Sequence, residues 1–365
     1  MVVDFNRKLI LENGEEYYGY AFGSTEDRVC EIVFNTSVVG YLEIITDPSY
    51  TGQGVVMPYP LIGNYGVAEE DFESRAATIS ALIVREYNDQ PSNFRYTKTL
   101  GEVLEENGIP GICGLDTRKL TRTIRDTGSK RALITSAETT LEEGLKIIAD
   151  TAVATDLVAQ VSCRKPWHSR TARHMYNVVA IDCGINLSLI RSLNTRGCNV
   201  TVVPYNTTAE AICALHPDGV VISNGPGCPE NVPEVIETIN ALRGKVPMFG
   251  TGLGHQLVAL AYSAKTVKLA CGHHGSNHAV RELSTGNMET FIQSHNYTVD
   301  AASLENTGLT ATHIDILDNT VVGLECTAEQ VFTTQFRPTD AEGPRARVCL
   351  IDKFVTMMKE AKTHV

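Results

Sequence analysis

The cysteines of this chain lack the spacing that metal and redox motifs require. Ten cysteines are scattered over 365 residues, and no two form a C-x-x-C pair. Zinc ribbons and thioredoxin-like redox centres both need such a pair. The sequence therefore predicts reduced, mostly buried thiols.

Long apolar runs and an excess of basic residues are also missing. The N-terminus (residues 1–8) lacks the charged and then apolar pattern of a secretory signal, so we expect a cytoplasmic protein. Lys and Arg number 31 against 43 Asp and Glu, which gives a net charge of −12 and a pI near 5.3. This balance argues against nucleic acid and membranes as partners.

The first half of the chain reads as a β-rich α/β domain. Residues 8–22 alternate around Asn13-Gly14, which predicts a β-hairpin. Helices are predicted over 99–107 and 117–126, each followed by a glycine-containing stop. Around residues 161–175 the periodicity disappears and basic residues cluster, which indicates a linker. We therefore expect domains at 1–160 and 176–365.

The second half alternates strands with helices. Apolar strands such as VVAIDCG and GVVISNGPG alternate with helical patterns over 185–196, 208–215 and 231–243. This alternation predicts an α/β fold with a doubly wound, mostly parallel sheet. Ligands of such sheets bind at the carboxyl ends of the strands.

Residues 245–262 predict a strand-to-helix elbow. A buried strand runs into a turn with Gly250, Gly252 and Gly254, and an apolar helix begins near His255. Such an elbow presents its middle residue at the tip of a sharp turn beside backbone N–H groups that can hold an oxyanion. The tip here is Gly252, which has no side chain.

These segments resemble the class I glutamine amidotransferases, and most closely the small subunit of carbamoyl phosphate synthetase, whose elbow reads G-x-C-L-G-H-Q. The N-terminal half carries F-N-T-S-x-x-G-Y-x-E-I-x-T-D-P-S-Y, P-x-I-G-N-x-G and L-D-T-R-K-L-T-R, which are similar to that subunit's N-terminal domain. The resemblance implies a flavodoxin-like amidotransferase domain over 176–365. Amidotransferase modules of other synthetases lack the N-terminal domain.

The resemblance also implies a Cys-His-Glu triad, and all three positions are changed. The family's cysteine aligns with Gly252, its histidine with Arg337 and its glutamate with Thr339. Arginine stays protonated in proteins, so it cannot serve as a base near neutral pH. We therefore expect no intact catalytic residue.

The substrate pocket of the family is half kept. Ser49, Gly225, Gly227, Leu253 and Gln256 match glutamine-contacting or oxyanion-loop positions. Where the family reads Q-N-H-G-F, this chain has Gln293, Ser294, His295, Asn296 and Tyr297. Cys228 also replaces a usual aspartate. The resemblance thus predicts a pocket in which glutamine binding is weakened.

Three other interpretations of the site residues are disfavoured. Rescue of the chemistry by Cys228 with His295, His273 or His274 is one, and it is disfavoured because the sequence puts no thiol at the elbow tip. His255, His273 and His274 match no zinc spacing, so we interpret them as structural and predict no metal. The three glycines of the elbow miss the dinucleotide fingerprint, because His255 occupies its third glycine position.

The sequence thus favours a small-subunit-like protein with a lost glutaminase triad. Its expected role is a structural or regulatory partner of a carbamoyl phosphate synthetase large subunit that uses ammonia. No cofactor is expected on this chain, whereas ATP and Mg²⁺ are expected on the large subunit. A working glutamine-hydrolysing subunit and a repurposed small-molecule-binding protein are the alternatives. Arginine and pyrimidine biosynthesis are both open as the pathway.

Overall fold

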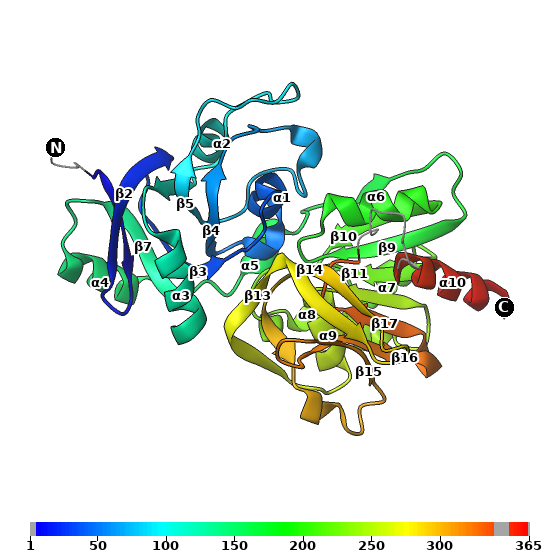
Figure 1. Ribbon diagram of the computed structural model, residues 1–365. Helices are drawn as coiled ribbons and strands as arrows, with labels where there is room; N and C mark the ends of the chain where they lie inside the picture. Colours follow the sequence, from blue (N-terminus) through cyan, green and yellow to red (C-terminus); the bar gives the residue numbers. More distant parts are fainter. Residues whose placement is uncertain (1–4, 339–349, 364–365) are drawn as a thin grey trace. The chain divides into compact units, whose positions relative to one another are not determined.

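The computed structural model describes residues 5–338 and 350–363, which form two compact units. The first unit comprises Met1–Ala154 and Ala270–Gly275, and the second comprises Thr155–Leu269 and Ser276–Val365. Figure 1 labels their helices and strands. Among the described residues, no helix is both long and apolar enough to cross a lipid bilayer.

The first unit is built on a closed seven-stranded barrel in the order β1-β2-β6-β5-β4-β3-β7. Closure pairs β1 with β7 and leaves this sheet without a free edge. The strands are β1 (Arg7–Leu11), β2 (Glu16–Gly23), β3 (Arg28–Phe34), β4 (Gln53–Ile62), β5 (Ala81–Tyr87), β6 (Pro110–Cys113) and β7 (Lys130–Ser136).

Four α-helices and two short 3-10 helices surround this barrel. They are α1 (Tyr41–Thr46), η1 (Pro48–Tyr50), η2 (Glu69–Asp71), α2 (Leu100–Glu106), α3 (Thr117–Thr127) and α4 (Leu141–Asp150). The predicted hairpin around Asn13-Gly14 and the helices predicted over 99–107 and 117–126 are all present. Capping boxes at Thr99 and Thr140 begin α2 and α4.

The second unit contains a ten-stranded sheet with a parallel centre. Strands β17, β12, β11, β9 and β10 lie next to one another and run parallel. The strands are β8 (Trp167–Ser169), β9 (Tyr176–Asp182), β10 (Cys198–Pro204), β11 (Gly219–Ile222), β12 (Met248–Thr251), β13 (Thr266–Glu282), β14 (Met288–Val299), β15 (Thr310–Asp315), β16 (Val321–Cys326) and β17 (Val331–Thr334). The predicted doubly wound α/β fold is confirmed.

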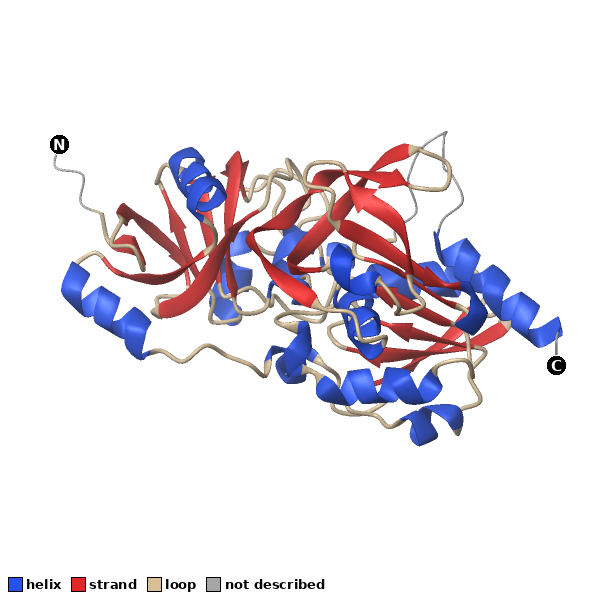
Figure 2. Cartoon of the chain, turned by 90° about the horizontal axis from the view of Figure 1, so that it is seen from below, coloured by secondary structure: helices blue, strands red, loops and turns tan. Residues whose placement is uncertain are grey.

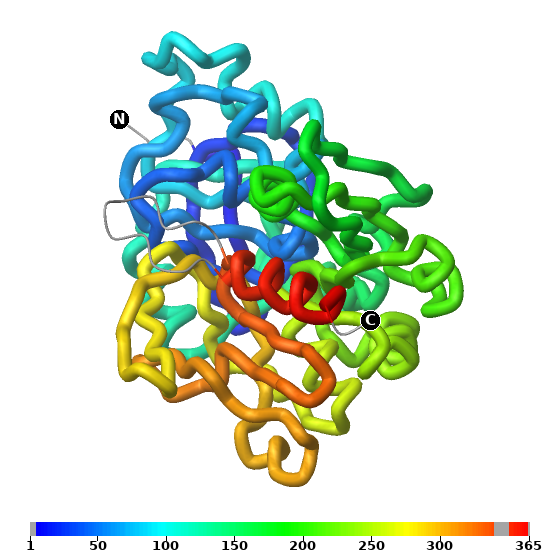
Figure 3. The backbone as a smooth tube through the Cα atoms, turned by 90° about the vertical axis from the view of Figure 1, so that its right-hand side faces the viewer, coloured from blue at the N-terminus to red at the C-terminus, as the bar shows by residue number. Residues whose placement is uncertain are grey.

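Helices cover both faces of the parallel strands, as Figure 2 shows. The described helices of this unit are α5 (Leu157–Val161), α6 (Leu187–Thr195), α7 (Ala209–Cys213), α8 (Pro233–Leu242), α9 (Leu253–Ala261) and α10 (Leu350–Thr363), with η3 (Pro229–Asn231), η4 (Ala301–Leu304) and η5 (Thr327–Glu329). Figure 3 shows α10 in red. The Arg196 guanidinium anchors α10 through Asp352, at 2.6 Å.

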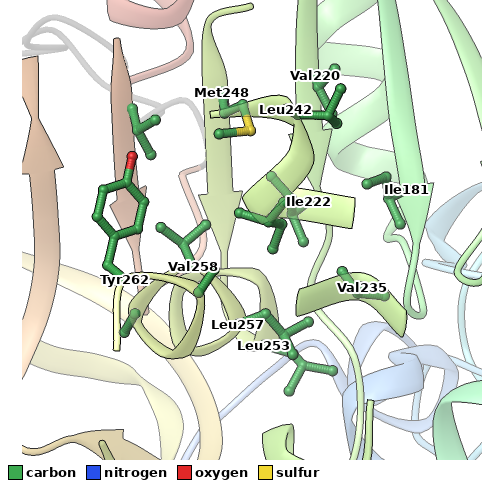
Figure 4. Close-up of a cluster of buried hydrophobic side chains, with 14 of the residues drawn as sticks. Ile181, Val220, Ile222, Val235, Leu242, Met248, Leu253, Leu257, Val258 and Tyr262 are labelled. Carbon is green, nitrogen blue, oxygen red and sulfur yellow. The ribbon is translucent and has the colours of Figure 1, made fainter. Parts of the chain in front are cut away.

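Two apolar layers result from this arrangement. Figure 4 shows the first, in which Val235 and Leu242 of α8 and Leu253, Leu257 and Val258 of α9 pack with strand residues. The second layer contains Leu189 and Leu193 of α6 and Phe354 and Met358 of α10. Burial of residues from both faces explains why β9, β11 and β12 read as continuous apolar runs.

The structure differs from the sequence prediction at two places. The segment 161–175 is not irregular throughout, because β8 adds an antiparallel edge strand to β10. Three residues are too short to show a period in the sequence. In addition, Ala270–Gly275 of β13 belong to the first unit, where the Ser129 N–H donates to the Ala270 carbonyl at 2.9 Å.

Candidate active site

The elbow is formed by β12 and α9, and Gly252 lies at its tip. Gly252 has φ 56° and ψ −115°, a conformation that L-residues adopt only with strain. Its N–H donates to the Thr334 carbonyl on the neighbouring strand β17, at 2.9 Å. Helix α9 begins at Leu253, two residues before the predicted start, because Gly252 already serves as its N-cap.

The close packing behind the elbow requires its other glycines. A Cβ on Gly250 would lie 2.7 Å from the Gly254 carbonyl oxygen, and a Cβ on Gly254 would overlap the Ile222 carbonyl. The Gly254 N–H donates to Ser223 at 3.0 Å. The three-glycine pattern is therefore explained by strand-to-helix packing, without any dinucleotide.

The loop after β11 lies directly against the tip. A Cβ placed on Gly252 would be 2.9 Å from Cβ of Asn224. The Asn224 side chain donates to the Gly184 carbonyl at 2.9 Å and to Asn186 Oδ1 at 3.0 Å, so this loop is held in place. Sequence reasoning singled out the neighbouring Gly225 and missed Asn224, although both belong to S-N-G-P-G.

Two predicted oxyanion-loop residues, Leu253 and Gly225, meet beside this tip. A Cβ on Gly225 would lie 3.0 Å from a Leu253 methyl group. The N–H groups of both residues have no hydrogen-bond acceptor among the described residues. Gly227 is exposed, and a Cβ placed on it would lie 3.4 Å from Leu157 of α5.

Gln256 has a buried, hydrogen-bonded position on α9. It is 2% exposed, and its side-chain NH₂ donates to the Tyr297 carbonyl at 2.8 Å and to Gln335 Oε1 at 2.9 Å. Both amide protons are therefore used inside the protein. These bonds join α9 to β14 and to the end of β17.

The family's histidine and glutamate positions follow β17. Arg337 is half-buried, and its N–H donates to the Ile292 carbonyl on β14 at 3.0 Å. Its position is close along the chain to Thr334, which pairs with Thr251 of β12. Thr339 lies outside the described residues.

The altered pocket segment lies on β14. Ser294 Oγ is buried and has no hydrogen-bond partner among the described residues, and Asn296 is 8% exposed. The ring nitrogens of His295 contact the Tyr297 carbonyl and Gln293 Oε1, each at 2.7 Å. Gln293 donates in turn to Asp315, which is fully buried. His295 is thus part of a structural hydrogen-bond chain.

Two other side chains near the strand ends, those of Cys183 and His255, are uncharged near neutral pH. Burial raises the pKa of the Cys183 thiol, so it stays protonated. Burial also lowers the pKa of His255 to about 3, and its Nδ1 lies 2.7 Å from Thr333 Oγ1. His255 is therefore a neutral, fully buried residue.

Ser49 and His274 belong to the first unit. Ser49 lies on η1, where its N–H is capped by Asp47 Oδ1 at 3.0 Å. The His274 ring centroid lies 5.4 Å from that of Tyr50. Both residues thus have defined contacts within that unit.

Comparison with known proteins decides the family. The chain is 47% identical over 361 residues to a carbamoyl phosphate synthase small chain from Listeria innocua, covering 98% of this chain and 99% of the relative. This chain belongs to the carbamoyl phosphate synthase small-chain family. A Staphylococcus saprophyticus protein of the same name is 46% identical over 357 residues, covering 98% of this chain and 97% of that protein.

Family models match both halves of this small-chain relative. Residues 9–134 match the carbamoyl-phosphate synthase small chain, CPSase domain, and residues 179–357 match glutamine amidotransferase class-I. A solved glutamine amidotransferase from Thermotoga maritima superposes with a TM-score of 0.37 at 16% identity, covering 52% of this chain and 86% of that chain. The family assignment rests on the sequence relatives.

Proposed function

We propose that this small-chain relative does not hydrolyse glutamine and acts as a structural or regulatory partner of an ammonia-using synthetase large subunit. The observation that carries the proposal is Gly252 at the elbow tip. Glutaminase chemistry of this kind needs a thiolate that attacks the carboxamide. A hydrogen atom stands where that sulfur would be.

The neighbouring positions support the same conclusion. Arg337 holds a positive charge where a base would be needed, and arginine does not lose its proton near neutral pH. Cys183 is the buried thiol that immediately follows β9, and burial raises its pKa, so it offers no thiolate. Neither a nucleophile nor a base is therefore provided by these residues.

The partner role rests on the family. The relatives carry the name of a small chain, which implies a large chain, and the match to this chain extends over nearly its whole length. The CPSase-domain match over residues 9–134 lies in the half of the chain that has no glutaminase motif. Association can therefore persist after the chemistry is lost. ATP and Mg²⁺ would then bind to the large subunit.

A working glutamine-hydrolysing small chain is the second candidate, because the relatives' names describe ordinary small chains. In this candidate another thiol would replace the missing one. Cys228 is the partly exposed thiol that follows the S-N-G-P-G loop. A repurposed small-molecule-binding protein is a further possibility that the half-kept pocket allows.

Glutamate release by the purified chain, alone and with a candidate large subunit, separates these functions. We expect a rate equal to that of a heat-denatured sample. Turnover well above that control would overturn the proposal, and its loss in Cys228→Ser would identify the rescuing thiol. Failure to co-purify with any large subunit would instead favour a repurposed binding protein.

A further inference from the structure

The edge of the sheet in the second unit carries a pocket far along the sheet from the elbow. Its volume is about 440 Å³, and it lies where β8, β9 and β10 meet the segment that follows β8. Its lining residues all have polar side chains except Val200, and none is a carboxylate: His168, Ser169, Arg170, Thr171, His174, Asn177, Asn199, Val200 and Thr201.

Strand register explains how the polar residues come together. Asn177 pairs with Asn199 across β9 and β10, and His168 pairs with Thr201 across β8 and β10. Directly paired residues, and residues two apart on one strand, share one face of a sheet. These four side chains therefore form a polar row on a single face.

Hydrogen bonds fix which groups the row presents. The Thr171 N–H donates to Asn199 Oδ1 at 3.0 Å, which holds the segment after β8 against the sheet. Because Oδ1 of Asn199 is used in this way, its NH₂ group is left to donate. Ser169 Oγ donates to Asn194 at 2.6 Å, so that hydroxyl is already engaged.

The pocket lining contains one arginine, Arg170, and no carboxylate. Arg170 and His174 are exposed, and among the described residues neither has an ion pair or a side-chain hydrogen bond. The nearby Asp218 carboxylate accepts from the Asn177 N–H at 2.7 Å and pairs with Lys362 at 2.9 Å. The Arg170 guanidinium is therefore not neutralised by a carboxylate among the described residues.

We infer that this pocket binds a small phosphate-bearing anion. The Arg170 guanidinium and the amide groups of Asn177 and Asn199 are donors that match several anionic oxygens. The lining has no aromatic ring apart from imidazoles, so it favours the phosphate group over a nucleobase. A volume of 440 Å³ lies within the usual range for small-molecule sites.

Pyrophosphate is a suitable probe, used with the full-length chain in isothermal titration calorimetry at low salt and without divalent cations. We expect saturable binding that weakens about tenfold or more in Arg170→Gln, because charge-assisted hydrogen bonds are lost. Asn199→Asp keeps the acceptor for Thr171 and replaces the donor by a negative charge, so it should weaken binding as well. Fluorescence of Trp167 checks that each variant is folded.

Arg281→Gln is the matched control, because Arg281 is an exposed arginine on β13, at the other end of the sheet. Its affinity for pyrophosphate should equal that of the wild type. Absence of saturable binding, or equal affinity in all variants, would overturn the inference. Tighter binding of an acidic peptide that Asn199→Asp leaves unchanged would also overturn it, in favour of a protein-docking surface.

Discussion

At the scale of single residues, the backbone of Gly252 has the shape of a nucleophile elbow without a side chain at its tip. Its φ of 56° and ψ of −115° do not depend on a side chain, because Thr334 and the start of α9 hold the turn. The S-N-G-P-G loop packs against the same point. The fold therefore specifies the bend, and the residue at the tip decides whether chemistry can follow.

Substitution of Gly252 by alanine should destabilise the second unit by about 1–3 kcal/mol. The alanine must adopt a positive φ, and its Cβ would lie 2.9 Å from Cβ of Asn224. Gly244→Ala is the control, because Gly244 has φ 67° but open space around its Cα. Urea unfolding followed by Trp167 fluorescence measures the difference, and equal losses in the two variants would contradict the contact with Asn224.

His255 predicts a pH dependence of stability. Burial lowers its pKa to about 3 in the folded state, while an unfolded histidine has a pKa near 6.5. The unfolded chain therefore binds more protons between these values, and stability is lost as the pH falls below about 6.5. The slope from this group is about 1.4 kcal/mol per pH unit.

The variant His255→Gln should lack this contribution. Its stability difference from the wild type should be largest at pH 7 and should shrink toward pH 4, because only the wild type loses the histidine contribution. Urea unfolding at several pH values measures this change. Two curves that stay parallel between pH 7 and pH 4 would contradict the neutral, buried state of His255.

At the scale of elements, an ion pair joins three segments of the second unit. Glu329 on η5 accepts from Arg243 Nε at 2.9 Å, just after α8, and from the Tyr262 hydroxyl at 2.6 Å, just after α9. Arg243 also lies 3.7 Å from the centroid of the Tyr262 ring. This cluster fixes the ends of both helices against the turn before β17.

Glu329→Gln should destabilise the unit by about 1–3 kcal/mol at pH 7, because the charge-assisted bond is lost. The Arg243 hydrogen bond lowers the pKa of Glu329, so this stabilisation is present above the unfolded pKa of about 4.5 and is lost as the pH falls further. The two proteins should therefore converge as the pH falls through the lowered pKa of Glu329. If the difference in unfolding free energy between the wild type and Glu329→Gln stayed constant with pH, packing rather than charge would explain the destabilisation.

The sequence predicted most elements of the second unit, because its strands and helices alternate with strong periodicity. It did not predict the closed barrel of the first unit, since closure depends on β7 pairing with both β1 and β3 over long sequence distances. It also missed β8, which has three residues. The elbow could be predicted because the sharp turn between β12 and α9 itself requires glycines, and these are visible in the sequence.

The candidate site was less readable than the fold. The sequence singled out Gln256 for ligand contact, but whether its amide protons are free depends on Tyr297 and Gln335, which lie far away in the chain. Likewise, the pKa of His255 follows from complete burial, which no local pattern reports. Residue type could be matched to a family, whereas hydrogen-bond partners required the folded chain.

At the scale of the whole molecule, the proposal predicts which nitrogen donor a complex can use. Together with a large subunit, this chain should support carbamoyl phosphate synthesis with ammonia and give no more than background with glutamine. The reason is that nothing at Gly252 can release ammonia from the amide. Carbamoyl phosphate formation with each donor is the measurement, and a large subunit alone is the control.

Equal rates with glutamine and ammonia would contradict this prediction. A rate with ammonia that is the same with and without this chain would exclude a regulatory effect, and co-purification of the two proteins would then test a structural one. The CPSase-domain match lies in the first unit and the elbow lies in the second, so the two properties can be lost separately.

The glycine at position 252 also determines which mutations could place a thiol at the elbow tip. Glycine codons GGU and GGC become cysteine codons by replacement of their first base, so a gene that uses either codon would need one base change to place a thiol at position 252. Such a variant would place a thiol at the tip of the turn, and its Cβ would meet the same strain as in Gly252→Ala. Arg337 would still occupy the position that matches the family's histidine, so the variant would gain a thiol without a proton acceptor at that position. A complete glutaminase triad would thus require changes at several codons, including those of Gly252 and Arg337.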